Sequence, residues 1–221
     1  PIHVNHSIPD AVAFAIECPA GVVIQTGDFK IDYTPISGGT LDLAAFAEYG
    51  KKGVLALLSD STNSERPGSS ASEKTVNAGL SALFARAEHE RIIVATFASN
   101  LDRVQQLADL AIKHGRKGAI SGRSMVKNTQ MARELGYLKI PEDVLIDIEQ
   151  INKFPPEKVA LITTGSQGET LSALSRMASN SHRNVHVGPG DFIIISATPI
   201  PGNEKMVTRT VNGLMKLGVD G

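Results

Sequence analysis

The chain contains 221 residues, 42% of them hydrophobic, and its 22 basic and 23 acidic side chains give a formal net charge of -1. This composition supplies enough apolar surface for a folded core and excludes a disordered chain. The near-zero charge excludes a general attraction to nucleic acid or to an anionic membrane, so any site for a polyanion must be local.

The sequence shows no disulfide framework and no membrane segment. Cys18 is the single cysteine, which fits a reducing compartment, and we expect it to be buried as a small core side chain. No apolar run approaches the roughly 20 residues that cross a bilayer, so no membrane contact is expected. The chain begins without Met and ends just after a helical pattern, which suggests a piece of a larger protein.

The first elements predict a small sheet with one helix. Residues 11–18 alternate small and large apolar side chains, as in a strand whose two faces can both be covered. Pro19-Ala20-Gly21 supplies a turn into a second strand at residues 22–24. A short helix is expected at residues 41–49 and a third strand at residues 54–58.

A change of composition at residues 64–71, toward Ser, Pro, Gly and charged residues, predicts a boundary between two modules. We assign residues 1–71 to the first module and residues 72–221 to the second. Ser70 and Glu73 have the spacing of a capping box, and the apolar stripe that follows predicts an amphipathic helix.

From residue 91 onward a buried strand that ends in small polar residues alternates with a helix. Strands are expected at residues 92–96, 117–121, 159–163 and 192–196, and helices at residues 101–114, 125–135, 170–180 and 206–217. Strands buried on both faces that alternate with helices predict an α/β fold with a mostly parallel sheet and right-handed crossovers.

Two residues of the first module are candidate metal ligands. Asp28 follows the strand at residues 22–24, where α/β folds place functional groups, and His6 lies on a loop before the hairpin. Neutral His and ionised Asp are both good ligands for zinc-like ions. The alternative is a surface His and a turn Asp with no metal. We expect Asp60, after the third strand, to orient or cap a loop.

The second module offers a candidate site at the edge where its parallel strands end. Small polar residues and glycines there should converge: Ser99, Asn100, Gly122, Ser124, Gly165, Ser166 and Gln167. Helix N-termini at this edge, with Arg103 and Arg123, favour a phosphate-containing ligand. The alternative is that these residues are ordinary caps and turns. His89, His114 and His182 are expected at the surface.

The motifs in view resemble the ribonuclease J family of metallo-β-lactamase/β-CASP nucleases over essentially the whole chain. The matching strings are Asn5-His6-Ser7-Ile8-Pro9-Asp10, Thr26-Gly27-Asp28-Phe29-Lys30, Ser59-Asp60-Ser61-Thr62-Asn63, Ala95-Thr96-Phe97-Ala98-Ser99-Asn100, Gly122-Arg123-Ser124-Met125, Thr164-Gly165-Ser166-Gln167-Gly168-Glu169 and Pro199-Ile200-Pro201-Gly202-Asn203. The resemblance implies part of a metallo-β-lactamase core at residues 1–71 and most of a β-CASP domain at residues 72–221.

The resemblance also implies a function. The family acts on RNA with endonuclease and 5′-to-3′ exonuclease activity, through two metal ions that are usually zinc, with Mn²⁺ or Mg²⁺ as alternatives. His6 matches a metal ligand and Asp28 the carboxylate that bridges the metals. The residues that match RNA contacts are Phe97, Ala98, Ser99, Asn100, Arg103, Ser166 and Gln167, with Phe97 as a stacking surface.

The implied partners are 5′-monophosphorylated RNA and either a second copy of the protein or a paralogue. The implied roles are ribosomal RNA processing and messenger RNA decay in the cytoplasm. The family's His-x-His-x-Asp-His motif is absent from these residues. Two ligands cannot hold two metals, so we expect the chain alone to bind metal poorly and to be nearly inactive.

Two other functions stay open at this point. The chain could be part of a non-catalytic RNA-binding or scaffolding paralogue whose metal motif is degraded. It could also be a domain that binds a small nucleotide, as the near-neutral charge and the loops at the strand ends suggest. An intact or degraded His-x-His-x-Asp-His motif upstream of Pro1 separates the enzyme from the paralogue. Binding of a mononucleotide compared with short 5′-monophosphorylated RNA tests the small-nucleotide domain, because an RNA enzyme should prefer the longer ligand and depend strongly on salt.

Overall fold

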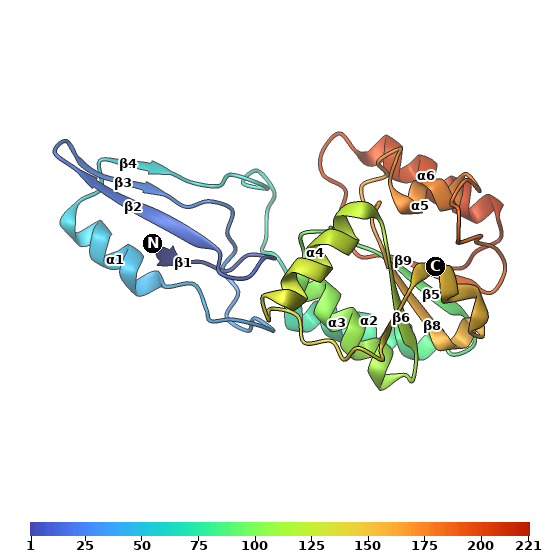
Figure 1. The fold of residues 1–221 in the computed structure, drawn as a ribbon. Coiled ribbons are helices and arrows are strands. Elements are labelled where there is room, and N and C mark those ends of the chain that lie inside the picture. The colour runs from blue at the N-terminus through green and yellow to red at the C-terminus, as the bar shows by residue number, and fades with distance from the viewer. The chain divides into compact units, whose positions relative to one another are not determined.

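The chain forms two units, residues 1–79 and residues 80–221, in a computed structural model that describes all of residues 1–221 (Figure 1). The first unit is built on a four-stranded sheet in the order β1-β2-β3-β4. Its strands are β1 (Ile2–His3), β2 (Val12–Cys18), β3 (Gly21–Gln25) and β4 (Ala56–Leu58). The β1–β2 and β2–β3 pairs are antiparallel and the β3–β4 pair is parallel.

One face of this sheet packs on helix α1 (Leu43–Lys52), which lies alongside the strands in Figure 1. The core between them contains Ala13 of β2, with Phe46 and Tyr49 of α1 packed against it. The larger apolar side chains of β2 alternate onto the opposite face, where Phe14 is 48% exposed and Ile16 is 52% exposed. The small alanine side chains therefore face the helix and allow it to approach closely.

Cys18 is exposed, so the prediction that it belongs to the core was wrong. Alternation along β2 places it on the same exposed face as Phe14 and Ile16, at the end of the strand. Its Sγ donates to the carbonyl oxygen of Gly21 across the hairpin turn at 3.2 Å.

Helix α2 (Glu73–Arg86) begins three residues after Ser70, but the predicted capping box with Ser70 is wrong. The backbone N–H of Lys74 donates instead to Ser72 Oγ at 3.2 Å, and that of Glu73 donates to Asp32 Oδ2 at 3.1 Å. The Glu73 carboxylate pairs with Lys30 Nζ at 3.0 Å. Ser72 and the Asp32 carboxylate, which is distant in sequence, thus accept from the first N–H groups of α2 in place of Ser70.

The second unit confirms the α/β fold with a parallel sheet flanked by helices. Its five strands are parallel and lie in the order β7-β6-β8-β5-β9. They are β5 (Arg91–Ala95), β6 (Lys117–Ser121), β7 (Leu145–Ile146), β8 (Val159–Thr163) and β9 (Asp191–Ile195). The four longer strands agree with the predicted ones to within a residue, whereas β7 was not predicted.

Helices cover both faces of this sheet (Figure 1). They are α3 (Leu101–Lys113), α4 (Arg123–Glu134), α5 (Ala173–Ala178) and α6 (Glu204–Lys216), with 3-10 helices η1 (Ile148–Lys153) and η2 (Pro156–Lys158). Alternate strand residues such as Ile93, Leu161 and Ile193 share one core with Leu174 of α5 and Leu214 of α6. Because the five strands are parallel, all of them end at one edge of the sheet, where the loops can carry polar groups.

Candidate functional site

In the first unit, backbone pairing brings His6 and Asp28 together. Asn5 and Lys30 form an isolated antiparallel bridge, in which the N–H of Lys30 donates to the carbonyl oxygen of Asn5 at 2.9 Å. The buried Asn5 side chain also accepts from the N–H of Leu41 at 2.9 Å, which fixes this loop to the start of α1. His6 Nε2 consequently lies 3.9 Å from Asp28 Oδ2, with the two side chains 36% and 77% exposed.

Asp60 holds the loop that carries Asp28. Its carboxylate accepts from the N–H of Thr62 at 2.8 Å and from the backbone of Phe29, the residue after Asp28. These hydrogen bonds, above all those from Thr62, hold the pKa of Asp60 below its usual value. The Asp60 N–H in turn donates to Thr26 Oγ1 at 2.9 Å. Asp60 therefore both caps its own loop and orients its neighbour, as the sequence predicted.

The donor chemistry of His6 and Asp28 fits part of a metal centre. An imidazole nitrogen and a carboxylate oxygen 3.9 Å apart can share one ion, since each would lie about 2 Å from it. No group of three or more His, Cys, Asp or Glu side chains in the chain is placed to hold a metal. The two residues supply two ligands, fewer than the three or four protein ligands of a zinc site.

In the second unit, the parallel register brings the predicted loops to one edge of the sheet. The N–H of Thr96 donates to the carbonyl oxygen of Thr163 at 3.0 Å, and that of Thr164 to Ser121 at 3.3 Å. The loops at residues 96–100, 122–124 and 164–169 therefore follow three adjacent strands, β5, β6 and β8. This adjacency is what the sequence predicted from the pattern of strand ends.

The loop after β5 presents its backbone and small side chains. Ser99 is exposed, and Phe97 and Ala98 are half-buried. Asn128 of α4 donates to the carbonyl oxygen of Ala98 at 2.9 Å, which fixes the loop. Asn100 is the N-cap of α3, where its Oδ1 accepts from the N–H of Arg103 at 3.0 Å. The first turn of α3 thus faces this edge with its positive dipole end.

Arg103 and Gln167 are buried and hold the loop that follows β9. The Arg103 guanidinium donates to Gln106 Oε1 at 3.1 Å and to the Ser196 hydroxyl. Gln167 is 2% exposed; its Nε2 donates to the carbonyl oxygen of Thr198 at 3.1 Å and its Oε1 accepts from the N–H of Ile200 at 2.7 Å. Both side chains form hydrogen bonds within the chain, and these bonds hold the loop after β9 in place at the strand edge.

Ser166 is the predicted site residue with an unsatisfied group. It is 1% exposed, and its Oγ has no hydrogen-bond partner. The preceding Gly165 has φ 114°, and an added Cβ would lie 2.8 Å from Leu174 Cβ, so this loop needs glycine to run against α5. The loop at residues 196–203 was missed as a site element, although its Pro199-Ile200-Pro201-Gly202-Asn203 string was a signal for it.

His182 is buried at the same edge, 7% exposed, so the prediction of a surface His was wrong. Its Nδ1 accepts from the N–H groups of Val185 at 3.1 Å and Asn184 at 3.3 Å. Nε2 must then carry the proton and donate to Ser121 Oγ, 3.0 Å away at the end of β6. Sequence context could not show this, because the residue's polar neighbours face solvent while its ring faces a strand.

Acid should destabilise the chain through His182. Burial, with a smaller effect of Arg176, lowers its pKa from the usual 6.5, so folding favours the neutral ring. The stability it contributes is fully present above pH 6.5 and is lost as the pH falls through the lower folded value. We expect the H182Q variant to lose less unfolding free energy than wild type between about pH 7.5 and about pH 5, by at most about 2 kcal/mol in denaturant titrations.

A control for this titration is the exposed His89. The H89Q variant should retain the full pH dependence of the wild type, because the His89 side chain lies in solvent and its removal leaves the buried His182 ring unchanged. Equal pH dependence in wild type and H182Q would contradict the assignment of His182 as a buried neutral acceptor.

A family model and several curated relatives match this chain, and they all belong to the same family. The family model described as ribonuclease J, beta-CASP domain, matches residues 89–214. Ribonuclease J of Helicobacter pylori is 49% identical over 215 residues, which cover 97% of this chain and 31% of that protein. Ribonuclease J of Mycolicibacterium smegmatis is 49% identical, with 97% and 38% covered. Ribonuclease J2 of Bacillus subtilis is 43% identical, with 96% and 38% covered.

The chain thus spans about a third of the length of these curated relatives. A crystal structure of a protein of unknown function from Enterococcus faecalis matches with a TM-score of 0.60 at 12% identity, covering 99% of this chain and 50% of that one. At that identity the likeness shows the fold alone. None of the helices combines the length and apolar composition needed to cross a bilayer.

Proposed function

Because the chain belongs to the ribonuclease J family and carries its β-CASP domain, we propose that it is the part of an RNA-processing nuclease that grips the RNA strand and contributes two metal ligands. The observation that carries this proposal is the convergence of the loops at residues 96–100, 122–124 and 164–169 at one strand edge. Such an edge offers free backbone N–H groups to phosphate oxygens and small residues that let a strand approach.

The proposal gives the edge residues two kinds of role. Phe97, Ala98, Ser99 and Asn100 contact the RNA, because their side chains are exposed or half-buried. Arg103 and Gln167 are buried and act by fixing the shape of the loops. Ser166 is buried too, but its Oγ has no partner within the chain, and a bound phosphate or water would satisfy it.

For the chemical step, His6 and Asp28 would hold metal, as zinc or alternatively Mn²⁺ or Mg²⁺. Metal ions bound there would supply Lewis-acid activation of water and neutralise charge on the phosphodiester. Asp60 keeps Asp28 in position through the backbone of Phe29. On this proposal the intact protein cleaves RNA both internally and from the 5′ end, with a preference for a 5′-monophosphate.

Loss of the Phe97 ring should weaken RNA binding. We expect F97A in the intact protein to bind 5′-monophosphorylated RNA about 5- to 150-fold more weakly, since stacking of a base on an aromatic ring contributes about 1–3 kcal/mol. Fluorescence anisotropy with 5′-monophosphorylated RNA, 5′-hydroxyl RNA and a mononucleotide measures this. The Y137A variant, which lacks an exposed aromatic side chain after α4, is the control and should bind as wild type does.

Tighter binding of the mononucleotide than of RNA would overturn the RNA assignment in favour of a small-nucleotide domain.

Several further properties stay predictions from the resemblance: the oligomeric state, a paralogue partner, roles in ribosomal RNA processing and messenger RNA decay, and a cytoplasmic location. Weak or absent cleavage by the 221-residue chain alone also stays a prediction, and robust metal-dependent turnover by it would contradict that expectation.

A further inference from the structure

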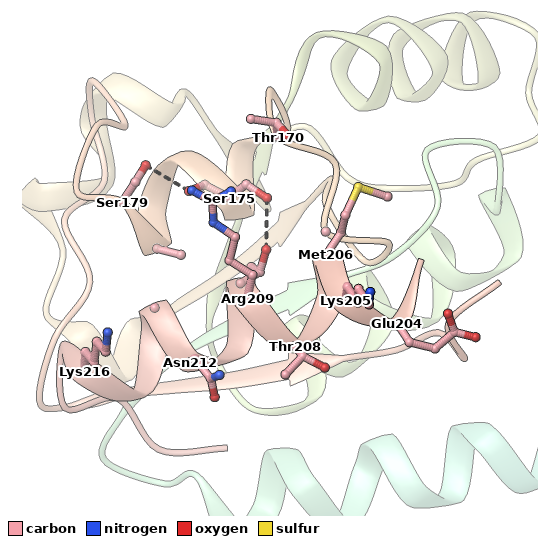
Figure 2. Close-up of a pocket in the computed structure, with 14 residues that line it drawn as sticks. Thr170, Ser175, Ser179, Glu204, Lys205, Met206, Thr208, Arg209, Asn212 and Lys216 are labelled. Atoms are coloured by element: carbon pink, nitrogen blue, oxygen red, sulfur yellow. Dashed lines mark hydrogen bonds between the residues drawn. The ribbon is translucent and has the colours of Figure 1, made fainter. Parts of the chain in front are cut away.

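A groove of about 700 Å³ lies between α5 and α6 in the second unit (Figure 2). Its walls carry three cations and several hydroxyl groups, and no aromatic side chain lines it. Figure 2 shows Arg209 extending from α6 toward Ser175 of α5 and Ser179, the residue that follows α5, with Lys205 and Lys216 near opposite ends of α6. Ser175 Oγ lies 3.2 Å from Thr210 Oγ1, so the floor of the groove joins the two helices.

The three cations form one basic stripe. Lys205, Arg209 and Lys216 stand at positions i, i+4 and i+11 of α6, which places them on one face over about 16 Å. None of them makes an ion pair or hydrogen bond within the chain. Glu204 is the only acidic residue of the lining, and its Oε2 accepts from the N–H of Gly202 at 2.9 Å. The groove is therefore locally positive in a chain whose net charge is -1.

The groove begins at the strand edge described above. Gly168 and Thr170, which follow Ser166 and Gln167 in the same loop, belong to its lining. Gly168 has φ 71°, and an added Cβ would overlap the backbone of Met206 in the first turn of α6. The loop after β8 thus rests directly on the helix that carries the basic stripe, which makes the edge and the groove continuous.

From this continuity we infer that the α5–α6 groove binds the phosphate backbone of the RNA strand where it extends beyond the strand-edge loops. The inference rests on the proposed function. Lys, Arg, Ser and Thr side chains are the usual partners of phosphate oxygens, and such partners position a strand without reading its sequence. The absence of aromatic lining favours backbone recognition over base stacking. The groove lengthens the RNA footprint and is indifferent to base sequence.

The test removes the stripe in the intact protein with the triple variant K205Q/R209Q/K216Q. A charge-matched control, K139Q/K153Q/K158Q, removes three exposed cations outside the groove. Binding of 5′-monophosphorylated RNA of about 4 and about 20 nucleotides is measured over a range of salt concentrations. We expect the triple variant to bind the longer RNA at least about tenfold more weakly and to bind the shorter RNA as wild type does.

The salt dependence gives a second readout. Each phosphate of a single strand that a protein cation neutralises contributes about 0.7 to the steepness of log K against log salt, so removal of three cations should reduce that steepness by about 2 for the longer RNA. Equal affinity of the triple and control variants for the longer RNA would overturn the groove inference alone. If the triple variant bound the short and the long RNA equally more weakly, the basic stripe would belong to the strand-edge site. That result would overturn the inference that the groove binds RNA beyond the strand-edge loops. Wild type that binds neither RNA would overturn the proposed function as well.

A single variant guards against misfolding of the triple one. Lys216 lies in the last turn of α6, is exposed, and makes no interaction on which the core depends. The K216E variant should lower the Tm by no more than a few degrees, since an acidic residue in the last turn of a helix costs about 0.3–1 kcal/mol, and should still weaken binding of the longer RNA. Unchanged binding of the longer RNA by a folded K216E variant would show that the RNA does not pass through the α5–α6 groove.

Discussion

Replacement of Asp28 by alanine in the intact protein is expected to lower the rate of RNA cleavage about a hundred- to a thousand-fold or more. The proposal makes this carboxylate a metal ligand, and metal-ion catalysis supplies several kcal/mol, with each 1.4 kcal/mol worth about tenfold in rate. The fold should be unaffected, because the Asp28 side chain is 77% exposed and surface substitutions of this kind change stability by about 0.5 kcal/mol or less. Single-turnover cleavage and thermal unfolding measure the two effects.

Asp143, whose side chain is 82% exposed, provides the matched control, and D143A should cleave at the wild-type rate. The H6A variant should lose activity as D28A does, because the two side chains lie 3.9 Å apart and would share an ion. Metal content measured on the same samples should fall in both variants. Wild-type cleavage by a folded D28A protein would remove this residue from the site and would leave the second unit as an RNA-binding domain only.

The R116M variant is expected to destabilise the second unit by about 3–5 kcal/mol. Arg116 is 4% exposed, and its guanidinium donates to four carbonyl oxygens in the segment after α2 and in β8. Those of Glu90 and Val159 lie 2.7 Å and 3.3 Å away, and that of Ala87 is a further acceptor. Hydrogen bonds from a charged donor contribute about 1.5–3 kcal/mol each, and methionine fills the space without donating.

Denaturant unfolding of the 221-residue chain measures this loss. The R116K variant should also be destabilised, because one ammonium group cannot reach acceptors arranged around a planar guanidinium. Arg183 is exposed, and R183M should unfold within about 0.5 kcal/mol of wild type. A change of under about 1 kcal/mol in R116M would show that water replaces the guanidinium at these carbonyls.

Most of the second unit's architecture could be predicted from local patterns. β5 and β8 are continuous apolar runs, because both of their faces are buried, and α3 ends before Gly115, which has φ 62°. By contrast, β1 and β7 have two residues each, too few for periodicity to show. The expected helix at residues 170–180 shortened to α5 because Ser172 caps it.

The candidate site divides in the same way. Strand ends and glycines in the sequence were enough to predict that residues 96–100, 122–124 and 164–169 meet at one edge, because parallel strands of one sheet must end together. The matching strings were enough to predict the family. Strand ends and family motifs both depend on residues that are adjacent in the chain, so they can be recognised in the sequence.

Only the tertiary structure decided which polar side chains face the ligand side and which face the interior. Arg103, Gln167 and His182 stand in polar stretches that look solvent-exposed, yet each is buried against a partner at least 31 residues away or across a strand. The physical reason is that a hydrogen bond formed across the fold leaves no periodic trace in the chain. The local pattern of this protein determines where its strands end, and long-range interactions determine what each strand end can bind.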